Sequence, residues 1–313
     1  MSTYRHLYGP VPSRRLGRSL GIDLVPPKVC TYDCIYCQVG QTTQKVVQRR
    51  EYIPAKEVLQ EVRRFLSQGE TSIDHFSLSG SGEPTLHSRI GSVIQGIKEM
   101  SPIPVAVLTN GSLFYSEEVR NDLRQADVIL PSLDAVSSDV FRRINRPYKG
   151  LSVKKVIKGL AAFRKIYPGQ IWLEILFCKG INDHRDELLE MKKVVEQIQP
   201  NRIHLNTVIR PPTEPWAAPL NSQEMEAIQA FFGEKASIIS EFDRHPLSLP
   251  GMNVKEEIYK ILQRRPLSLI DLSRRMAIPK KELEATLQPM VEEGKIKARG
   301  FGDSVYYEIS KVR

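Results

Sequence analysis

Residues 20–37 read LGIDLVPPKVCTYDCIYC, and this stretch decides the fold. The run LGIDLV (20–25) is short and almost entirely apolar, as a buried strand is. Two prolines at 26 and 27 end that run, because proline lacks the N–H that a strand ladder needs. Cysteines follow at 30, 34 and 37. The stretch therefore predicts a strand whose carboxyl end carries a cysteine loop.

The alternation that begins here continues from residue 19 to about 240, where short apolar runs alternate with amphipathic stretches. This is the pattern of strands joined by crossover helices, and near-continuous apolar strands indicate a parallel sheet buried on both faces. We therefore predict an α/β fold, an open or closed barrel. The six predicted strands are 20–25, 75–80, 104–110, 127–134, 171–177 and 202–209. The predicted helices lie near 56–67, 87–100, 115–125, 151–166, 184–198 and 221–234.

Polar motifs follow each predicted strand. Because the carboxyl ends of parallel strands share one edge of the sheet, where ligands bind, the six motifs predict a single site. They are the cysteine loop, SGSGEPT (79–85), TNG (109–111), PSLDA (131–135), CKGIND (178–183) and NTVIRPPTEP (206–215).

Composition limits the class of protein. The chain has 313 residues, 41% of them hydrophobic, which suffices for one large core and a small second domain. Its formal net charge of +9 favours anionic partners such as nucleic acid, nucleotides or phosphorylated metabolites. The N-terminus has no signal-peptide segment, and no apolar run approaches the roughly 20 residues of a membrane helix. Four cysteines, three of them within eight positions, fit a reducing compartment. These features predict a cytoplasmic protein without a membrane partner.

The spacing Cys30-x-x-x-Cys34-x-x-Cys37 brings three thiolates into one loop. Three thiolates can bind three corners of a four-iron cube and leave the fourth iron open, as an open catalytic metal site requires. Zinc in a structural site would need a fourth ligand. The nearest other cysteine is Cys178, and no histidine pair has zinc-finger spacing. We therefore predict that Cys30, Cys34 and Cys37 are ligands of an iron–sulfur cluster.

This loop resembles the defining motif of the radical S-adenosylmethionine superfamily, C-x-x-x-C-x-φ-C, with Tyr36 at the aromatic position φ. The resemblance covers roughly residues 8 to 215 and implies a partial (β/α)6 barrel that binds a [4Fe-4S] cluster and S-adenosylmethionine. The implied reaction is one-electron cleavage of the cofactor to methionine and a 5'-deoxyadenosyl radical, which abstracts hydrogen from a substrate. A flavodoxin or ferredoxin is implied as electron donor.

The same resemblance assigns cofactor contacts. Gly80, Gly82 and Glu83 resemble the GGEP element that holds the methionyl ammonium group. The other implied contacts are Ser132 and Asp134 for the ribose, Thr109 and Asn110 for the methionyl carboxylate or ribose, Gly180 near the adenine, and Asn206 close by. The alternative for TNG and SLDA is that these polar residues only begin loops and cap the next helix.

Several polar residues outside the resemblance are also candidates for the site. Arg14, Arg15, Arg18 and Arg210 form either a clamp for a phosphate or carboxylate or a solvated surface cluster. Cys178 is either a hydrogen-atom donor at the site or a small buried hydrophobe. We interpret His75, His87 and His204 as structural.

The last part of the chain changes character after the segment HPLSLPGM (245–252), which predicts a joint between a core domain (1–245) and a second domain (253–313). Three predicted helices and a two-stranded hairpin resemble a winged helix-turn-helix, with Pro289 an anomaly in the third helix. Such a domain binds nucleic acid (tRNA or DNA), binds a leader peptide, or only packs against the core. The phosphate contacts predicted for nucleic acid are Lys280, Lys281, Lys295, Lys297 and Arg299.

At family level, the opening segment, GSGEPTLH and NTVIRPP resemble single-cluster, wyosine-synthase-like iron–sulfur oxidoreductases. Wyosine synthases, molybdenum-cofactor cyclases and peptide modifiers with auxiliary clusters all carry further cysteines, which this chain lacks. The cysteine count therefore argues against all three of these activities. The substrate stays unidentified, with RNA and peptide as the two classes considered. The alternative function is a non-catalytic redox sensor, in which the cluster switches the winged helix.

Overall fold

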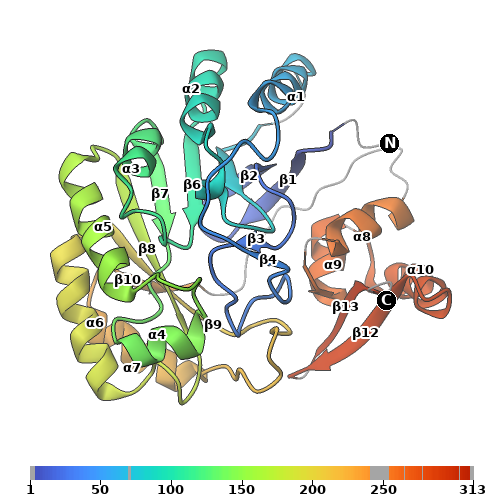
Figure 1. Cartoon of the computed structure of the whole chain (residues 1–313). Helices are drawn as coiled ribbons and strands as arrows, with labels where there is room; N and C mark the ends of the chain where they lie inside the picture. The colour runs from blue at the N-terminus through green and yellow to red at the C-terminus, as the bar shows by residue number, and fades with distance from the viewer. Residues whose placement is uncertain are drawn as a thin grey trace.

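A parallel sheet with one antiparallel edge strand forms the centre of the computed structural model, which describes residues 4–69, 72–239, 254–263, 265–276, 278–302 and 304–310. In this part of the chain the strand order is β1-β2-β5-β6-β7-β8-β9-β10 (Figure 1). All neighbours pair in parallel except β1 and β2. The strands are β1 (Leu7–Ser13), β2 (Gly17–Asp23), β5 (His75–Ser79), β6 (Val105–Thr109), β7 (Val128–Pro131), β8 (Gln170–Phe177), β9 (Arg202–Thr207) and β10 (Ala236–Ile238). The predicted α/β fold with a parallel sheet is confirmed.

Two strands of this sheet were not predicted. Strand β1 contains Pro10 and Pro12, which cannot donate to a ladder, and it lies at the edge of the sheet, where proline is tolerated. Strand β10 has only three residues, too few for a recognisable apolar pattern. These two strands form the two edges of the sheet.

Helices follow the strands and cover the outer face of the sheet (Figure 1). In α5, Val156, Leu160 and Phe163 are buried at helical spacing, and the Ser152 side chain caps the first turn. Each predicted helix is present, and α4 is an additional short one. The helices are α1 (Ala55–Ser67), α2 (Ile90–Met100), α3 (Glu117–Leu123), α4 (Ser138–Ile144), α5 (Val153–Ile166), α6 (Arg185–Ile198) and α7 (Ser222–Phe232), with a 3₁₀ turn at Pro84–Leu86.

Between strand β2 and helix α1 the chain forms the cysteine loop. Two short parallel strands, β3 (Val29–Cys30) and β4 (Gln44–Lys45), pair across the loop and fix its two ends. The first cysteine therefore lies in regular backbone.

The C-terminal part has a hydrophobic cluster of its own, which includes Ile258, Leu272, Leu283 and Leu287. Its elements are α8 (Val254–Leu262), β11 (Leu267–Ser268), α9 (Leu269–Met276), α10 (Lys280–Glu292), β12 (Ile296–Phe301) and β13 (Ser304–Ile309), with strand order β11-β13-β12. The three predicted helices and the hairpin are present, and α10 continues through Pro289. The predicted joint at 245–252 lies outside the described residues. The winged helix-turn-helix stays a prediction, as do the two domain boundaries.

Across the described ranges, none of the helices combines the length and the apolar character that crossing a bilayer requires.

The edge strand β1 is held by a buried carboxylate. Glu61 of α1 accepts hydrogen bonds from the backbone N–H groups of Arg5, His6 and Leu7 at 2.8, 2.9 and 3.3 Å. Replacing Glu61 with alanine leaves these donors without their acceptor, so we expect the free energy of unfolding to fall by about 1–3 kcal/mol. Denaturant unfolding measures this loss. E226A, at an exposed position of α7, is the matched control and should change stability by less than about 0.5 kcal/mol; equal effects would contradict the role of Glu61.

Candidate active site

The three cysteines of the loop are reduced and partly exposed. Each sulfur lies near a side-chain nitrogen: Lys28 Nζ is 3.1 Å from Cys37 Sγ, Asn110 Nδ2 is 3.4 Å from Cys30 Sγ, and Asn145 Nδ2 is 3.4 Å from Cys34 Sγ. N–H donors around sulfur ligands stabilise the thiolate form and orient it. The loop therefore presents three thiols with preformed support for negative charge.

The residues fit an iron–sulfur cluster. Burial raises the pKa of the Cys30 thiol to about 12, with a further contribution from the Glu83 charge, and burial also raises the pKa of Cys34. A metal group supplies the positive charge that keeps such thiols deprotonated. Within the described ranges, no three His, Cys, Asp or Glu side chains are grouped to hold one metal ion.

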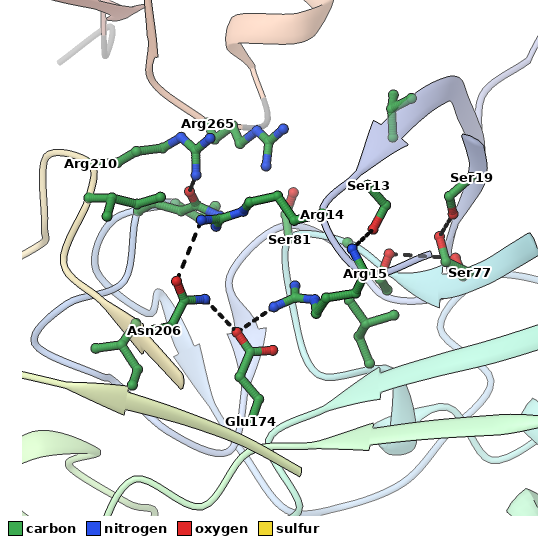
Figure 2. A pocket seen from close by; sticks show the side chains of 18 of the residues that line it. Ser13, Arg14, Arg15, Ser19, Ser77, Ser81, Glu174, Asn206, Arg210 and Arg265 are labelled. Carbon is green, nitrogen blue, oxygen red and sulfur yellow. Dashed lines mark hydrogen bonds and ion pairs between the residues drawn. The ribbon is translucent and has the colours of Figure 1, made fainter. Parts of the chain in front are cut away.

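The cysteine loop borders a cavity of about 360 Å³, and Figure 2 shows side chains that line this cavity. Cys37 and Tyr36 line it on one side, and Ser77, Ser79 and Gly80 line it from strand β5 and its end. Strands β8 and β9 supply Glu174, Leu176 and Asn206. Of the predicted cofactor contacts, Tyr36, Gly80 and Asn206 line this cavity, whereas Gly82, Glu83, Thr109, Asn110, Ser132, Asp134 and Gly180 do not.

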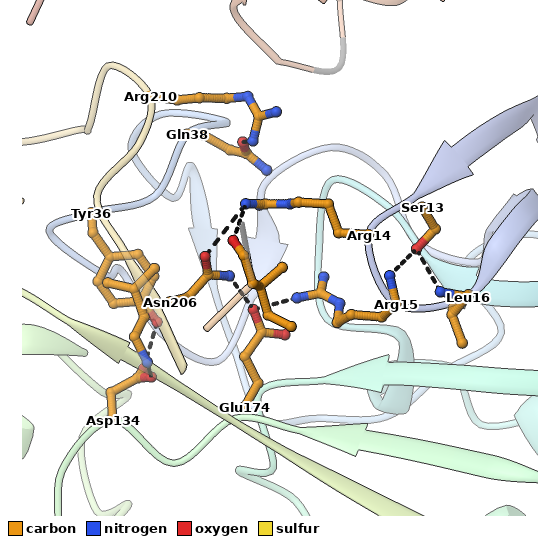
Figure 3. A network of polar contacts seen from close by, with 12 residues as sticks. Ser13, Arg14, Arg15, Leu16, Tyr36, Gln38, Asp134, Glu174, Asn206 and Arg210 are labelled. Carbon is orange, nitrogen blue, oxygen red and sulfur yellow. Dashed lines mark hydrogen bonds and ion pairs between the residues drawn. The ribbon is translucent and has the colours of Figure 1, made fainter. Parts of the chain in front are cut away.

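A charged network crosses the cavity between the first hairpin and strand β8 (Figure 3). Arg15 Nη1 lies 2.5 Å from Glu174 Oε1, which also accepts from Asn206 Nδ2 at 2.9 Å. Burial raises the pKa of Glu174, but Arg15, Asn206 and Arg14 lower it more, so the net shift is downward. Glu174 was not predicted, although a carboxylate inside the apolar strand IWLEILF was a usable signal, because buried charges are kept only with a partner.

Arg14 reaches across the open side of the sheet. Its Nη1 lies 3.5 Å from Asn206 Oδ1 and 3.4 Å from the carbonyl oxygen of Ile239, just after strand β10. Arg14, Arg15 and Arg210 line the cavity, whereas Arg18 does not. The predicted basic set is therefore brought together except for Arg18, whose backbone N–H donates to Asp74.

Glu83 is buried below the cysteine loop, 2% exposed. Its carboxylate accepts from Thr85 N and Oγ1, from Thr109 Oγ1 at 2.6 Å and from Asn110 N at 2.8 Å. Burial raises the pKa of Glu83, and these hydrogen bonds act against that rise. Glu83 thus positions Thr109 and Asn110, which in turn contacts Cys30 and Thr31.

The two glycines of the SGSGEPT segment allow close approach between loops. A side chain on Gly80, which has φ +127°, would meet Asp23 Oδ1 at 1.9 Å. A side chain on Gly82 would meet the carbonyl oxygen of Val29 at 2.4 Å. From the sequence, these glycines were expected to let the backbone approach a ligand closely. In the structure, the atom nearest to a side chain at Gly82 belongs to Val29, at the start of the cysteine loop.

Asp134 is 3% exposed and lies under Tyr36 (Figure 3). It accepts from Tyr36 Oη at 2.5 Å, Asn145 Nδ2 at 2.8 Å and Leu176 N at 3.0 Å. Burial raises the pKa of Asp134, and the donation from Tyr36 acts against that rise. Because Asn145 also contacts Cys34, this carboxylate supports the cysteine loop from below. Asn145 and Lys28 were missed, because no sequence pattern links them to cysteines.

Near strand β8, Gly180 lies in an exposed turn with φ +70°. Its neighbour Asn182 is buried, donates to the carbonyl oxygens of Asp134 and Leu176, and accepts from Cys178 N. Ser132 is partly buried and pairs with Glu174 through the backbone. This turn therefore anchors Asp134.

The remaining candidates lie within the protein core or bond to backbone. Cys178 is fully buried in the main hydrophobic cluster. This position agrees with the interpretation of Cys178 as a small buried hydrophobe. His75 and His87 contact the carbonyl oxygens of Leu16 and Ile53 at 2.9 and 2.7 Å, and His204 packs edge-on against Trp172.

Comparisons with known proteins agree with this site. A model of the radical SAM superfamily matches residues 24–191. A UPF0026 protein of Methanocaldococcus jannaschii is 32% identical over 312 residues, which cover 96% of this chain and 94% of that protein. A protein of Brachyspira hyodysenteriae named GTPase Obg is 36% identical over 296 residues, 94% of this chain but only 43% of that protein. This chain thus spans less than half of that relative.

Among solved structures, TYW1 with a bound lysine–pyruvate adduct is similar with a TM-score of 0.55 and 20% identity, over 70% of this chain and 74% of that chain. SuiB of Streptococcus suis, bound to S-adenosylmethionine, has a TM-score of 0.51 at 14% identity, over 70% of this chain and 50% of that chain. At these identities the likeness concerns the fold. Together with the match over the cysteine loop and the parallel sheet, it leads to one assignment: the chain belongs to the radical SAM superfamily, whose enzymes use a [4Fe-4S] cluster and S-adenosylmethionine.

Proposed function

We propose that this radical SAM enzyme abstracts a hydrogen atom from a substrate bound in the cavity that begins at Cys37 and Tyr36. One observation carries the proposal: the cysteine loop, the end of strand β5 and the polar residues of β8 and β9 line the same cavity. A substrate bound in this cavity would therefore lie next to the loop that holds the cluster.

In this proposal Cys30, Cys34 and Cys37 would hold the [4Fe-4S] cluster. The cluster and S-adenosylmethionine, when bound, would supply the one-electron chemistry that starts hydrogen abstraction. The chain's own residues bind and orient. Lys28, Asn110 and Asn145 stabilise the sulfurs, Glu83 and Asp134 fix the residues beneath them, and Tyr36, Gly80 and Asn206 face the cavity.

Lys28 is expected to raise the reduction potential of the bound cluster. Its ammonium group contacts Cys37, so K28M removes a positive charge and a donor beside the reduced, more negative cluster. We expect the midpoint potential to fall by about 60 mV, the one-electron equivalent of a charge-assisted hydrogen bond of about 1.4 kcal/mol. Redox titration followed by electron paramagnetic resonance measures it. K193M, at an exposed lysine paired with Glu190, is the control; the same potential in K28M and the wild type would contradict the role.

Enzymes of this class need an electron donor, and we propose flavodoxin or ferredoxin. The wyosine-synthase-like resemblance, an RNA or peptide substrate and a cytoplasmic location also remain proposals. For nucleic acid, Lys280 and Lys281 begin helix α10, but Lys295 and Lys297 pair with Glu293 and Glu308. These pairs reduce the charge available for phosphates.

Anaerobic reduction of the reconstituted protein with S-adenosylmethionine tests the function. We expect 5'-deoxyadenosine and methionine in equal amounts, formed only when cluster, reductant and cofactor are all present. A cluster that is reduced but yields neither product would contradict the proposed enzymatic activity and would favour the alternative function of a redox sensor.

A further inference from the structure

Arginine side chains gather around one cavity. Among the residues that the structure describes, Arg14, Arg15, Arg210 and Arg265 line it together with one acidic residue, Glu174 (Figure 2). Glu174 is paired with Arg15 at 2.5 Å. Taken together, these five lining residues carry a formal charge of about +3.

Arg210 is the group that most needs a partner. The residue is 8% exposed, its Nε has no hydrogen-bond partner, and its Nη1 donates only to the neutral Gln38 Oε1, at 3.3 Å. A buried charge without an opposite charge is costly, because neither water nor a counter-ion solvates it. An anion in the cavity would supply what Arg210 lacks.

The C-terminal part of the chain forms one wall of this cavity. Ile261 lies on the buried face of helix α8, and Arg265 lies in the short segment before strand β11; both line the cavity. The hydroxyl of Tyr306, on β13, donates to the carbonyl oxygen of Ile209 at 2.9 Å, next to Arg210. Residues about 250 positions apart, Arg14 and Arg265, therefore face the same space.

Phosphate fits this charge better than carboxylate does. A phosphate monoester carries about −1.5 to −2 at neutral pH, whereas a carboxylate carries −1. Guanidinium groups match phosphate oxygens with parallel N–H donors. Serine side chains also line the cavity, at positions 13, 77, 79 and 81, and their hydroxyl groups suit a polar molecule. The volume of about 360 Å³ is that of a small-molecule site.

We propose that the substrate carries a phosphate or diphosphate group, bound by Arg14 and Arg210 of the core and by Arg265 of the C-terminal part. This inference rests on the proposed function, because only an enzyme has a substrate. The anion-binding site itself is defined by the arginine side chains and can be tested without that function. The C-terminal part thus completes the substrate site.

Isothermal titration of the full-length, cluster-containing protein with inorganic pyrophosphate tests the proposal, with malonate as the dicarboxylate probe. We expect pyrophosphate to bind more tightly than malonate. We expect R210Q and R265Q each to weaken pyrophosphate binding by about tenfold or more, the loss of one charge-assisted contact. R210K should recover part of the affinity. R142Q, at an exposed arginine paired with Asp139, is the matched control and should bind as the wild type does.

Several results would overturn the proposal. These are no binding of pyrophosphate, equal binding of malonate, or unchanged affinity in R210Q. Unchanged affinity in R265Q would remove the C-terminal part from the site. R210Q that weakens S-adenosylmethionine binding but not pyrophosphate binding would assign Arg210 to the cofactor instead. If R210Q does not fold, as judged by circular dichroism, R210K and R265Q decide the question. Pyrophosphate is titrated without cofactor or reductant, so failure of this site and failure of cofactor cleavage are told apart.

Discussion

Replacing any one of Cys30, Cys34 and Cys37 with serine is expected to abolish the iron–sulfur absorbance of the protein and its cleavage of S-adenosylmethionine. Serine is a hard oxygen ligand that stays protonated at neutral pH, whereas iron in these clusters is held by thiolates. With only two thiolates left, the cube loses a corner, and no other cysteine lies in the loop. Iron and sulfide content and 5'-deoxyadenosine formation measure the two losses.

Cys178 provides the matched control. It is fully buried in the main hydrophobic cluster and does not line the cavity, so C178A should keep full iron content and cofactor cleavage. Removing its sulfur should lower stability by only about 1 kcal/mol. A loop variant that retains iron and turnover, or a C178A protein that loses them, would show that the ligands have been assigned wrongly.

The second large effect is expected from a single methyl group at Gly82. The segments 28–30 and 81–83 are joined by hydrogen bonds from Lys28 N to Ser81 O at 2.7 Å and from Glu83 N to Val29 O at 3.0 Å. An alanine Cβ at 82 would lie 2.4 Å from that same Val29 oxygen. Such an approach is not possible for real atoms, so the start of the cysteine loop must move.

We expect G82A to lose stability by about 1–3 kcal/mol and to reduce cofactor cleavage on the order of a hundredfold, because a shift of about 1 Å in a reacting group has that consequence. Thermal unfolding and 5'-deoxyadenosine formation measure these effects. In G300A the added methyl group meets no atom within 4 Å, so this variant should behave as the wild type. Normal turnover in G82A would mean that the two segments can separate without affecting the site.

The cysteine loop and the parallel strands could be predicted because both are local patterns. Thiolate spacing lies within eight residues, and each inner strand is an apolar run that reads the same in isolation as in the sheet. Strand β1 was not predicted because it contains two prolines, which argue against a strand unless the strand lies at the edge of a sheet. The sequence alone does not show that β1 lies at the edge. The exclusion of Arg18 from the cavity likewise depends on which way the first hairpin turns.

By itself, the sequence determined the α/β class and the three thiols as cluster ligands, since these depend on residue type and short spacing; the cofactor chemistry came from the resemblance to the superfamily. Only the tertiary structure decided the partners of the site: Lys28 on Cys37, Asn145 between Cys34 and Asp134, and Glu174 facing Arg15. It also brought Arg265 to a cavity otherwise built from the core. The physical reason is that burial and charge pairing select these contacts, and both exist only after the chain has folded; Arg15 and Glu174, for example, are 159 positions apart in the sequence.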